Sequence, residues 1–282
     1  MTTTMNNPAG TSPGSDWNAE TATHWIAAQS AMEAMLRPFS QVLCAYLEDI
    51  AEGHVLDVGC GTGATTFDIQ NQLKPGGQCT GIDISEAMTA VARERAAREG
   101  SRARFICADA QGHDFGHARF DAVVSRFGVM FFNDPVAAFA NLRGACADGA
   151  PLHMVTWRSP AENPFMTLAR DTALPLLPAP IARQDKPTGQ FAFADPAHVT
   201  DNLAHAGWSD IAIETCDAAC VFPVGALKAY AARMGPIGRL MPLLDSALQE
   251  RVTAAVLDAY HPYVHGDEVR FNAACWVISA RS

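Results

Sequence analysis

The stretch VLDVGCGTGATT at residues 55–66 decides the fold. An apolar run ends just after Asp57, and Gly59, Gly61 and Gly63 then occupy alternate positions before a helical pattern begins. Because glycine has no Cβ atom, a loop of this kind can turn sharply and bring its backbone close to a ligand. The stretch therefore predicts a strand, a ligand-binding loop and a helix, in that order.

Outward from this loop, short apolar runs alternate with helical patterns. Helices are expected from about Thr62, from Ser85, from Asp134 and from Asp195, with a helical insertion over residues 225–260. The runs expected to form strands are HVLDV (54–58), CTGID (79–83), ARFICAD (103–109), FDAVVS (120–125), PLHMVTW (151–157), DIAIETC (210–216) and FNAACWVISA (271–280). Regular alternation of strands and helices predicts an α/β fold, in which a parallel sheet carries helices on both faces.

The N-terminal part is expected to be helical after a polar tail. Apolar residues recur at helical spacing between Trp17 and Ala51, and Pro38 is expected to separate two helices there. Residues 1–15 contain no Lys or Arg and no apolar run, so neither a secretory signal nor a mitochondrial presequence is predicted. No apolar stretch approaches the roughly 18 residues of a membrane span, so none is expected.

The composition favours a folded protein that acts on a small molecule. Of the 282 residues, 49% are hydrophobic and 18% are charged, which excludes a disordered chain. The formal net charge of −10 argues against a nucleic-acid partner, because phosphate binding requires a basic face. The eight cysteines lie mostly in apolar segments, which is typical of reduced thiols in a cytoplasmic protein.

No metal site is predicted. Cys216 and Cys220 have no second pair of ligands near them in the sequence, and Gly116 and Pro262 interrupt the two histidine pairs that are spaced four apart. The arginines within residues 92–104 are expected at the solvated C-terminal end of a helix, where positive charge complements the helix dipole.

The glycine loop alone is compatible with two kinds of cofactor. Residues 59–64 also match the GxGxxG/A pattern of dinucleotide binding, and Asp83 lies about twenty residues further on, where an acidic residue would hold a ribose. That interpretation predicts an NAD(P)-dependent oxidoreductase. However, Asp57 would place a carboxylate beside the loop, where it would repel a diphosphate and attract a cationic ligand.

Further motifs follow in a fixed order. Asp83 ends the strand in GIDIS (81–85), Asp109 ends the strand in ICADA (106–110), and residues 120–157 predict a strand, an aromatic loop, a helix and another strand. With these motifs the chain resembles the class I S-adenosylmethionine-dependent methyltransferases, within the small-molecule group that includes ubiquinone-type C-methyltransferases. The similarity covers roughly residues 17–282. It implies a Rossmann-like sheet of seven mostly parallel strands, with the last strand antiparallel.

The resemblance also implies a domain organisation. Residues 1–16 would be a disordered tail, and residues 17–282 a single methyltransferase domain. Within it, residues 17–51 would form a helical cover and residues 52–158 the cofactor-binding core. The two remaining segments, 159–207 and 222–270, are expected to form lid insertions over the acceptor pocket.

S-adenosyl-L-methionine is the cofactor that the resemblance implies. Its methionine part would contact Asp57 and the loop from Gly59 to Gly63, including Cys60 and Thr62. Asp83 would accept hydrogen bonds from both ribose hydroxyls.

The other end of the cofactor, its adenine, would lie further along the same edge. Ile84 and Met88 would flank the ring, and Asp109 and Ala110 would meet its amino edge. Three residues would face the sulfonium: Ser125, Arg126 and Phe127. The N-terminal helical segment would fold across the cofactor through three more: Trp17, Trp25 and Gln29.

Methyl transfer requires an acceptor held in line with the sulfonium methyl and kept away from water. The candidates for a general base are His24, on the covering segment, and His153, on the fifth strand. The residues expected to line a lipophilic or aromatic acceptor pocket are Met130, Phe131, Trp157, Arg158 and Phe165. A non-catalytic cofactor-binding module is a third interpretation, and a homodimer is left open.

Overall fold

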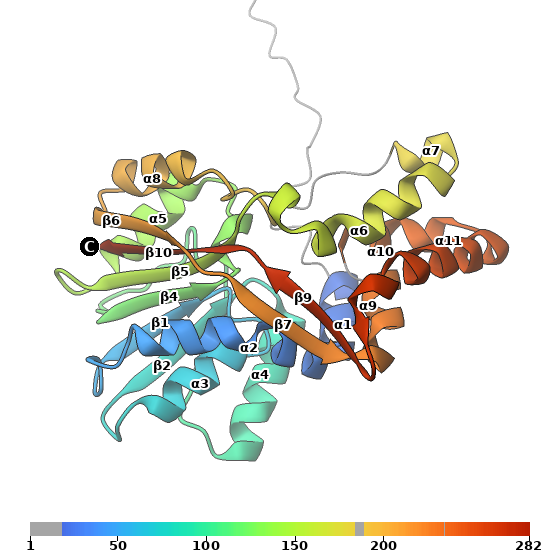
Figure 1. The fold of residues 1–282 in the computed structure, drawn as a ribbon. Coiled ribbons are helices and arrows are strands. Elements are labelled where there is room, and N and C mark those ends of the chain that lie inside the picture. The colour runs from blue at the N-terminus through green and yellow to red at the C-terminus, as the bar shows by residue number, and fades with distance from the viewer. Residues whose placement is uncertain (1–18, 184–188, 234) are drawn as a thin grey trace, which may run out of the picture.

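The computed structural model describes residues 19–183, 189–233 and 235–282. Its larger sheet has seven strands and lies to the left in Figure 1. The strand order is β3-β2-β1-β4-β5-β10-β6. Strand β10 runs antiparallel to β5 and β6, and the other neighbouring pairs are parallel. The bounds are β1 His54–Val58, β2 Gln78–Asp83, β3 Arg104–Cys107, β4 Ala122–Arg126, β5 Pro151–Trp157, β6 Ser209–Thr215 and β10 Cys275–Arg281. This arrangement confirms the predicted sheet, including its antiparallel last strand.

Helices cover both faces of the sheet, as predicted. On one face α2 packs against α3, and α4 packs against β2 and β3. On the other face α5 lies beside α8, and the Trp208 Nε1 atom donates a hydrogen bond to the Phe139 carbonyl of α5 at 2.9 Å. The bounds are α1 Ala19–Ala27, α2 Gln29–Ala45, α3 Ala64–Gln72, α4 Glu86–Glu99, α5 Pro135–Gly144 and α8 Pro196–His205. The apolar core fills the space between these helices and the central strands.

The local signals for helix starts agree with the structure. Ser85 caps α4 by accepting a hydrogen bond from the Met88 backbone, and Asp134 caps α5 in the same way from Ala137. Asp195 caps α8, and in α5 and α8 a proline occupies the first turn, where its missing N–H costs nothing. Asp134 therefore has the structural role that its position before Pro135 predicts.

The expectation that Pro38 separates two helices is wrong. Helix α2 continues through Pro38, and the chain instead breaks at Ala28, between α1 and α2. A proline inside a helix removes one hydrogen bond. Here the buried side chains of Met35 and Phe39, on either side of Pro38, pack the helix against the sheet and offset that loss.

A second, smaller sheet lies beside the first, and the sequence patterns did not predict it. It has the order β7-β9-β8, with bounds β7 Ala218–Pro223, β8 Val264–His265 and β9 Glu268–Ala273. Helices α6 Pro164–Ala173, α7 Ala179–Ala182, α9 Leu227–Arg233, α10 Gly235–Leu240 and α11 Ser246–Ala259 accompany it. We call these three strands and five helices the arm. In Figure 1 its helices extend away from the main sheet, and β7 runs alongside α2.

Residues 271–280, which read as one strand, belong to two different sheets. The chain leaves the small sheet at Ala273 and enters the large one at Cys275. Between them, the Ala274 carbonyl accepts from the Arg158 backbone N–H at 3.0 Å, and both backbone groups of Ala274 bind the Asn163 side chain. These hydrogen bonds replace the strand-to-strand hydrogen bonds that the Ala274 backbone would make within a sheet. The predicted first insertion also differs, since α8 packs on the main sheet rather than in the arm.

None of the helices in the described ranges is both long and apolar enough to cross a membrane.

Candidate functional site

The three loop glycines have different surroundings. All three have positive φ angles, of 70° at Gly59, 54° at Gly61 and 88° at Gly63, which favour glycine. A Cβ atom on Gly59 would lie 2.5 Å from the Gly128 Cα atom, and one on Gly63 would lie 2.8 Å from the Phe105 ring. At Gly61 the nearest side-chain atom is the Met88 sulfur, at 3.9 Å. Gly59 and Gly63 thus allow close packing, whereas Gly61 presents open backbone that a ligand can approach.

Asp83 fixes the position of this loop. It ends β2, and its carboxylate accepts hydrogen bonds from the backbone N–H groups of Gly61 at 2.8 Å and Ser85 at 2.9 Å. Burial raises the pKa of the Asp83 carboxyl, and these backbone donors act in the opposite direction. A carboxylate has about four lone-pair positions, so two bonds leave acceptor capacity for a pair of hydroxyls.

The residues around Asp83 form a surface with both apolar and acidic side chains, which we call the shelf. Ile84 exposes 44% of its surface although it is large and apolar, whereas Met88 is buried beneath the loop. Asp109 follows β3 and is exposed, and its Oδ1 atom accepts from the Gln111 backbone at 2.9 Å. The Ala110 carbonyl accepts from the Asn141 side chain at 3.0 Å. An exposed isoleucine beside two acidic residues suits a flat, partly polar ring.

Asp57 points into the protein rather than across the loop. It is 1% exposed, and its Oδ2 atom accepts a hydrogen bond from the Thr66 hydroxyl of α3 at 2.6 Å. Burial raises the pKa of the Asp57 carboxyl to about 6, while Thr66 and the Arg126 charge act against that rise. Cys60 is also buried, with its sulfur close to Gly81. In the structure Asp57 and Cys60 support the loop from below.

The end of β4 joins the loop to the N-terminal cover. The Ser125 hydroxyl donates a hydrogen bond to the Val58 carbonyl at 2.8 Å and accepts one from the Gly128 N–H at 3.2 Å. Both partners of this hydroxyl are therefore backbone groups. The Arg126 Nη1 atom donates to the Ser40 hydroxyl of α2 at 2.8 Å. Burial lowers the pKa of the Arg126 guanidinium, and nearby carboxylates, Asp57 first among them, raise it.

Phe127 follows in a strained conformation. Its φ angle of 60° is rare for a bulky side chain, and such strain is often found at functional sites. The Phe127 ring stacks on Trp157 at 4.4 Å and meets Phe39 edge-on at 5.2 Å. Met130 is buried, and Phe131 is partly buried against the core. The carboxyl ends of β4 and β5 therefore carry a compact aromatic group of Phe39, Phe127 and Trp157.

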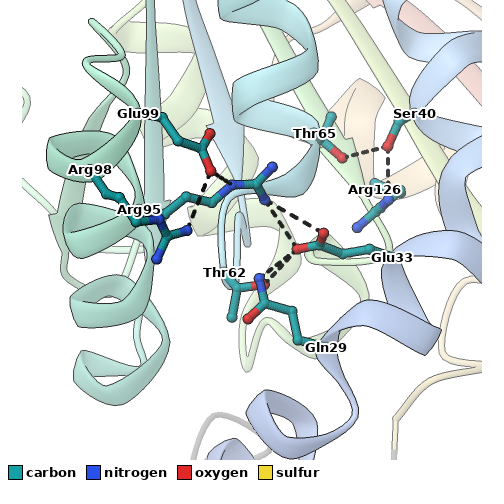
Figure 2. Close-up of polar contacts among 9 residues, drawn as sticks. All are labelled: Gln29, Glu33, Ser40, Thr62, Thr65, Arg95, Arg98, Glu99 and Arg126. Atoms are coloured by element: carbon teal, nitrogen blue, oxygen red, sulfur yellow. Dashed lines mark hydrogen bonds and ion pairs between the residues drawn. The ribbon is translucent and has the colours of Figure 1, made fainter. Parts of the chain in front are cut away.

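Glu33, which the sequence patterns did not single out, faces the loop from α2, and Arg95 of α4 links to it (Figure 2). The Glu33 Oε1 atom on α2 accepts from the Gln29 amide at 2.7 Å and from the Thr62 hydroxyl at 3.4 Å. The Arg95 Nη1 atom on α4 lies 3.3 Å from the same oxygen. Glu33 follows Gln29 by four positions, so helical spacing could have placed it beside that candidate. The sequence predicts Arg95 on a solvated helix end, but its side chain pairs with Glu33 of α2 and lies over the Phe67 ring.

The N-terminal candidates are only partly described. Trp17 lies outside the described residues. His24 falls within α1, but its side chain also lies outside what the structure describes. Trp25 is partly buried against the core, and Gln29 holds Glu33 as stated above.

The structure places His153, a candidate for the general base, away from the glycine loop. It lies near the amino end of β5, whereas the glycine loop and Asp83 lie at the carboxyl ends of their strands. Its Nδ1 atom pairs with the Ser279 hydroxyl at 2.9 Å, and its ring stacks on Tyr46 at 4.4 Å. Burial lowers the pKa of His153 to about 4, so the ring stays neutral at physiological pH. The predicted strand at residues 151–157 has the bounds of β5, so it already put His153 near the amino end.

Two of the acceptor-pocket candidates have structural partners instead. Arg158 forms ion pairs with Glu162 and, at 2.9 Å, with Asp217, and its guanidinium lies over the Trp276 ring. Phe165 is 1% exposed and stacks on Phe271 at 3.9 Å within the arm. Arg158 holds the base of the arm, and Phe165 belongs to its core.

The described residues fit a nucleoside ligand with a charged tail. Gly61 offers open backbone, Asp83 offers acceptors for a diol, and Ile84 offers an apolar surface for a ring. Beyond the loop, Glu33 and Arg126 supply one negative and one positive group. Open α/β sheets bind ligands at this carboxyl edge.

Comparison with known proteins identifies the class. A methyltransferase-domain family matches residues 55–149. The demethylmenaquinone methyltransferase of Thermus thermophilus is 30% identical over 167 residues, which are 56% of this chain and 76% of that protein. The aklanonic acid methyltransferase DauC of Streptomyces sp. is 34% identical over 104 residues, 36% of this chain and 47% of that protein.

A solved structure gives the same fold. Phosphoethanolamine N-methyltransferase 2 of Haemonchus contortus, in complex with phosphomonomethylethanolamine and S-adenosylhomocysteine, shares 17% identity and a TM-score of 0.50. The match covers 82% of this chain and 49% of that one. The fold and the loop thus define a Rossmann-like methyltransferase. The chain belongs to the class I S-adenosylmethionine-dependent methyltransferases, and the oxidoreductase interpretation finds no support.

Proposed function

We propose that this methyltransferase binds S-adenosylmethionine along the carboxyl ends of β1, β2 and β4 and methylates a small, flat, largely apolar acceptor. The observation that carries the cofactor site is the Asp83 carboxylate, which holds the Gly61 N–H at 2.8 Å and keeps acceptor capacity beside it. In this proposal Asp83 binds the ribose hydroxyls, and Ile84 and Met88 border the adenine. Asp109 and Ala110 lie at the edge of that shelf.

The chain's contribution to the reaction is positioning and exclusion of water. S-adenosylmethionine, when bound, supplies a methyl group on a sulfonium that needs no further activation. Because a guanidinium would repel a sulfonium, Arg126 is better suited to the cofactor's carboxylate than to its sulfur. Phe127 and Trp157 form the apolar wall at the end of β4 and β5, which suits the reacting atoms of the acceptor.

The acceptor class rests on two observations. The names of two relatives give demethylmenaquinone and aklanonic acid as the molecules on which those proteins act. In this chain Phe127 packs with the buried rings of Phe39 and Trp157 where β4 and β5 end, and Phe127 itself is only partly buried. Aromatic rings stack with flat apolar molecules, and so this group favours a planar acceptor. We propose that the arm covers this side of the site.

We further propose that the protein works in a reducing compartment such as the cytoplasm. All eight cysteines are free, and five of them are buried. The buried thiols have raised pKa values because of their burial, which keeps them protonated and unreactive.

Titration calorimetry of the full chain tests the cofactor site. S-adenosylmethionine, S-adenosylhomocysteine and NADH are titrated into wild type, Asp83→Ala and the matched control Asp134→Ala, which removes only a helix cap. We expect wild type to bind the first two ligands, and Asp83→Ala to weaken them at least about tenfold. Asp134→Ala should bind as wild type does. Binding of NADH alone would contradict the proposal and return the loop to dinucleotide binding.

The acceptor proposal needs a separate measurement. Wild type is incubated with methyl-labelled S-adenosylmethionine and a panel of quinols, polycyclic phenols and short aliphatic amines. We expect label in the planar aromatic compounds. Label in the amines alone would overturn the acceptor class and leave the cofactor site standing.

A further inference from the structure

One carboxylate faces the glycine loop from outside, and it comes from the N-terminal cover. Glu33 on α2 reaches the Thr62 hydroxyl (Figure 2), as its hydrogen bond shows. Its side chain remains 26% exposed. Its Oε1 atom takes the hydrogen bonds from Gln29 and Thr62. In the described ranges, the Oε2 atom accepts a hydrogen bond from the Arg95 Nη1 atom at 3.5 Å.

Arg95 does not fully neutralise this carboxylate. Its Nε atom binds Glu99 at 3.1 Å, so one guanidinium is shared between two acidic side chains. Its Cζ atom also lies 4.4 Å from the centre of the Phe67 ring, which anchors it over α3. Glu33 therefore keeps both a vacant lone pair and negative charge on the side of the loop.

The other acidic residue of the loop cannot serve this side. Asp57 is 1% exposed and its Oδ2 atom is bound to Thr66 beneath the loop. A cation that lies above Gly61 and Thr62 would therefore meet Glu33 rather than Asp57. The resemblance to methyltransferases assigned the methionine end to Asp57, but the structure places a different carboxylate there.

A positive group completes the arrangement. Arg126 is tied to the same helix, with its Nη1 atom 2.8 Å from the Ser40 hydroxyl and 3.5 Å from the Leu36 carbonyl. The Glu33 carboxylate is among the charges that raise the pKa of Arg126, so the two groups share one electrostatic environment. Glu33 of α2 and Arg126 of β4 thus supply one negative and one positive group beside the loop, which complements an amino-acid end with an ammonium and a carboxylate.

We infer that Glu33 binds the α-ammonium group of the cofactor's amino-acid end, with Arg126 on the carboxylate. The inference rests on the proposed function and adds a specificity-determining residue to it. It also gives α2 a direct part in binding, since the cover would be held in place by the ligand that it covers. Charge-assisted hydrogen bonds of this kind are stronger than hydrogen bonds between neutral groups.

The test compares two ligands that differ only at that end. S-adenosylhomocysteine has the amino-acid end, whereas methylthioadenosine has the adenosine and sulfur without it. We titrate both by calorimetry into wild type and Glu33→Gln, which keeps the shape and an acceptor but loses the charge. Expected is a loss of about ten- to a hundredfold in affinity for S-adenosylhomocysteine, with methylthioadenosine unchanged within about twofold.

Arg95→Ala is the matched control. It removes the ion pair between α2 and α4 but leaves the Glu33 carboxylate, so S-adenosylhomocysteine affinity should change by less than about fivefold. Equal losses for both ligands in Glu33→Gln, or no loss, would overturn the inference, because Glu33 would then act only as a link between helices or not at all. If wild type bound neither ligand, the proposed cofactor site itself would fail. Thermal unfolding of each variant confirms that it is folded.

Discussion

At the scale of single residues, burial has set the properties of the ionisable groups near the site. Asp57 and His153 lie on the sheet face that α2 and α3 cover, and burial opposes the charged form of each. The pKa of Asp57 rises to about 6, and that of His153 falls to about 4. Both shifts disfavour charge, yet they give opposite dependences of stability on pH.

For Asp57, the folded state keeps its proton to a higher pH than the unfolded state does. The contribution of Asp57 to the free energy of unfolding should therefore fall as pH rises from about 4 to about 6, by up to about 3 kcal/mol, and stay lower above that range. Asp57→Asn accepts the Thr66 hydrogen bond without charge and should lose this dependence. Urea unfolding of both proteins across that range measures the difference, in which the contribution of His153 cancels. A difference that does not vary with pH would contradict the expectation.

For His153, the expected result is retained activity. The residue lies four positions before Trp157, about 13 Å along the strand from the carboxyl edge where the reaction is proposed to occur. His153→Gln should keep kcat/KM within about threefold of wild type, since no proton transfer passes through this ring. A loss of a hundredfold or more, roughly the contribution of a general base, would restore His153 as a catalytic residue.

The same variant should change stability in acid. The contribution of His153 to stability is lost as pH falls from about 6.5 to about 4, because the unfolded chain protonates this histidine and the folded chain resists it. His153→Gln should lack that loss.

At the scale of elements, different glycines of the loop serve packing and ligand binding. Gly59 lies against Gly128 of the loop after β4, whereas Gly61 has open space beside it. Both have positive φ angles, so a side chain strains either position. The two glycines should therefore respond differently to the same substitution.

Gly59→Ala should destabilise the fold by about 2–5 kcal/mol, because strain adds to a backbone clash. Gly61→Ala should cost only about 1–2 kcal/mol of strain but should weaken cofactor binding, since its methyl group would occupy the open side. Chemical unfolding and S-adenosylhomocysteine calorimetry on both variants separate the two effects. If both variants lost the same stability and bound S-adenosylhomocysteine equally well, the proposed difference between Gly59 and Gly61 would be wrong.

At the scale of the whole molecule, three of the segments that join the main sheet to the arm contact one another, at Arg158, Asp217 and Ala274. There Arg158 pairs with Asp217, and the Asn163 side chain bonds both backbone groups of Ala274 at 2.9 Å. Asn163 is 1% exposed, so its loss leaves buried backbone groups without partners. The arm therefore depends on a small set of polar contacts at its base.

Asn163→Ala should cost about 2–4 kcal/mol of stability, most of it in the arm. Hydrogen exchange should speed up in α6, β7 and β9, while β1 and β4 keep wild-type protection. Asn272→Ala, at an exposed position of β9, is the control and should leave both rates unchanged. Uniformly faster exchange over the main sheet would show that the arm and sheet unfold as one unit.

The sequence by itself determined the central sheet and the identity of the loop. The alternation around residues 55–66, the acidic end of β2 at Asp83 and the caps at Ser85 and Asp134 each depend on residues close together in the chain. Local geometry is enough for such features, because a strand, a turn and a helix start are specified by a few neighbours. The order of these elements then fixed the fold class.

Only the tertiary structure decided which side chains meet. Glu33 and Arg95 are sixty-two positions apart, and their contact depends on where α2 and α4 pack. The orientation of Asp57 toward Thr66 and the division of residues 271–280 between two sheets likewise arise from long-range packing. Periodicity tells which residues are buried but not which partner buries them, because that choice is made by elements far away in the sequence.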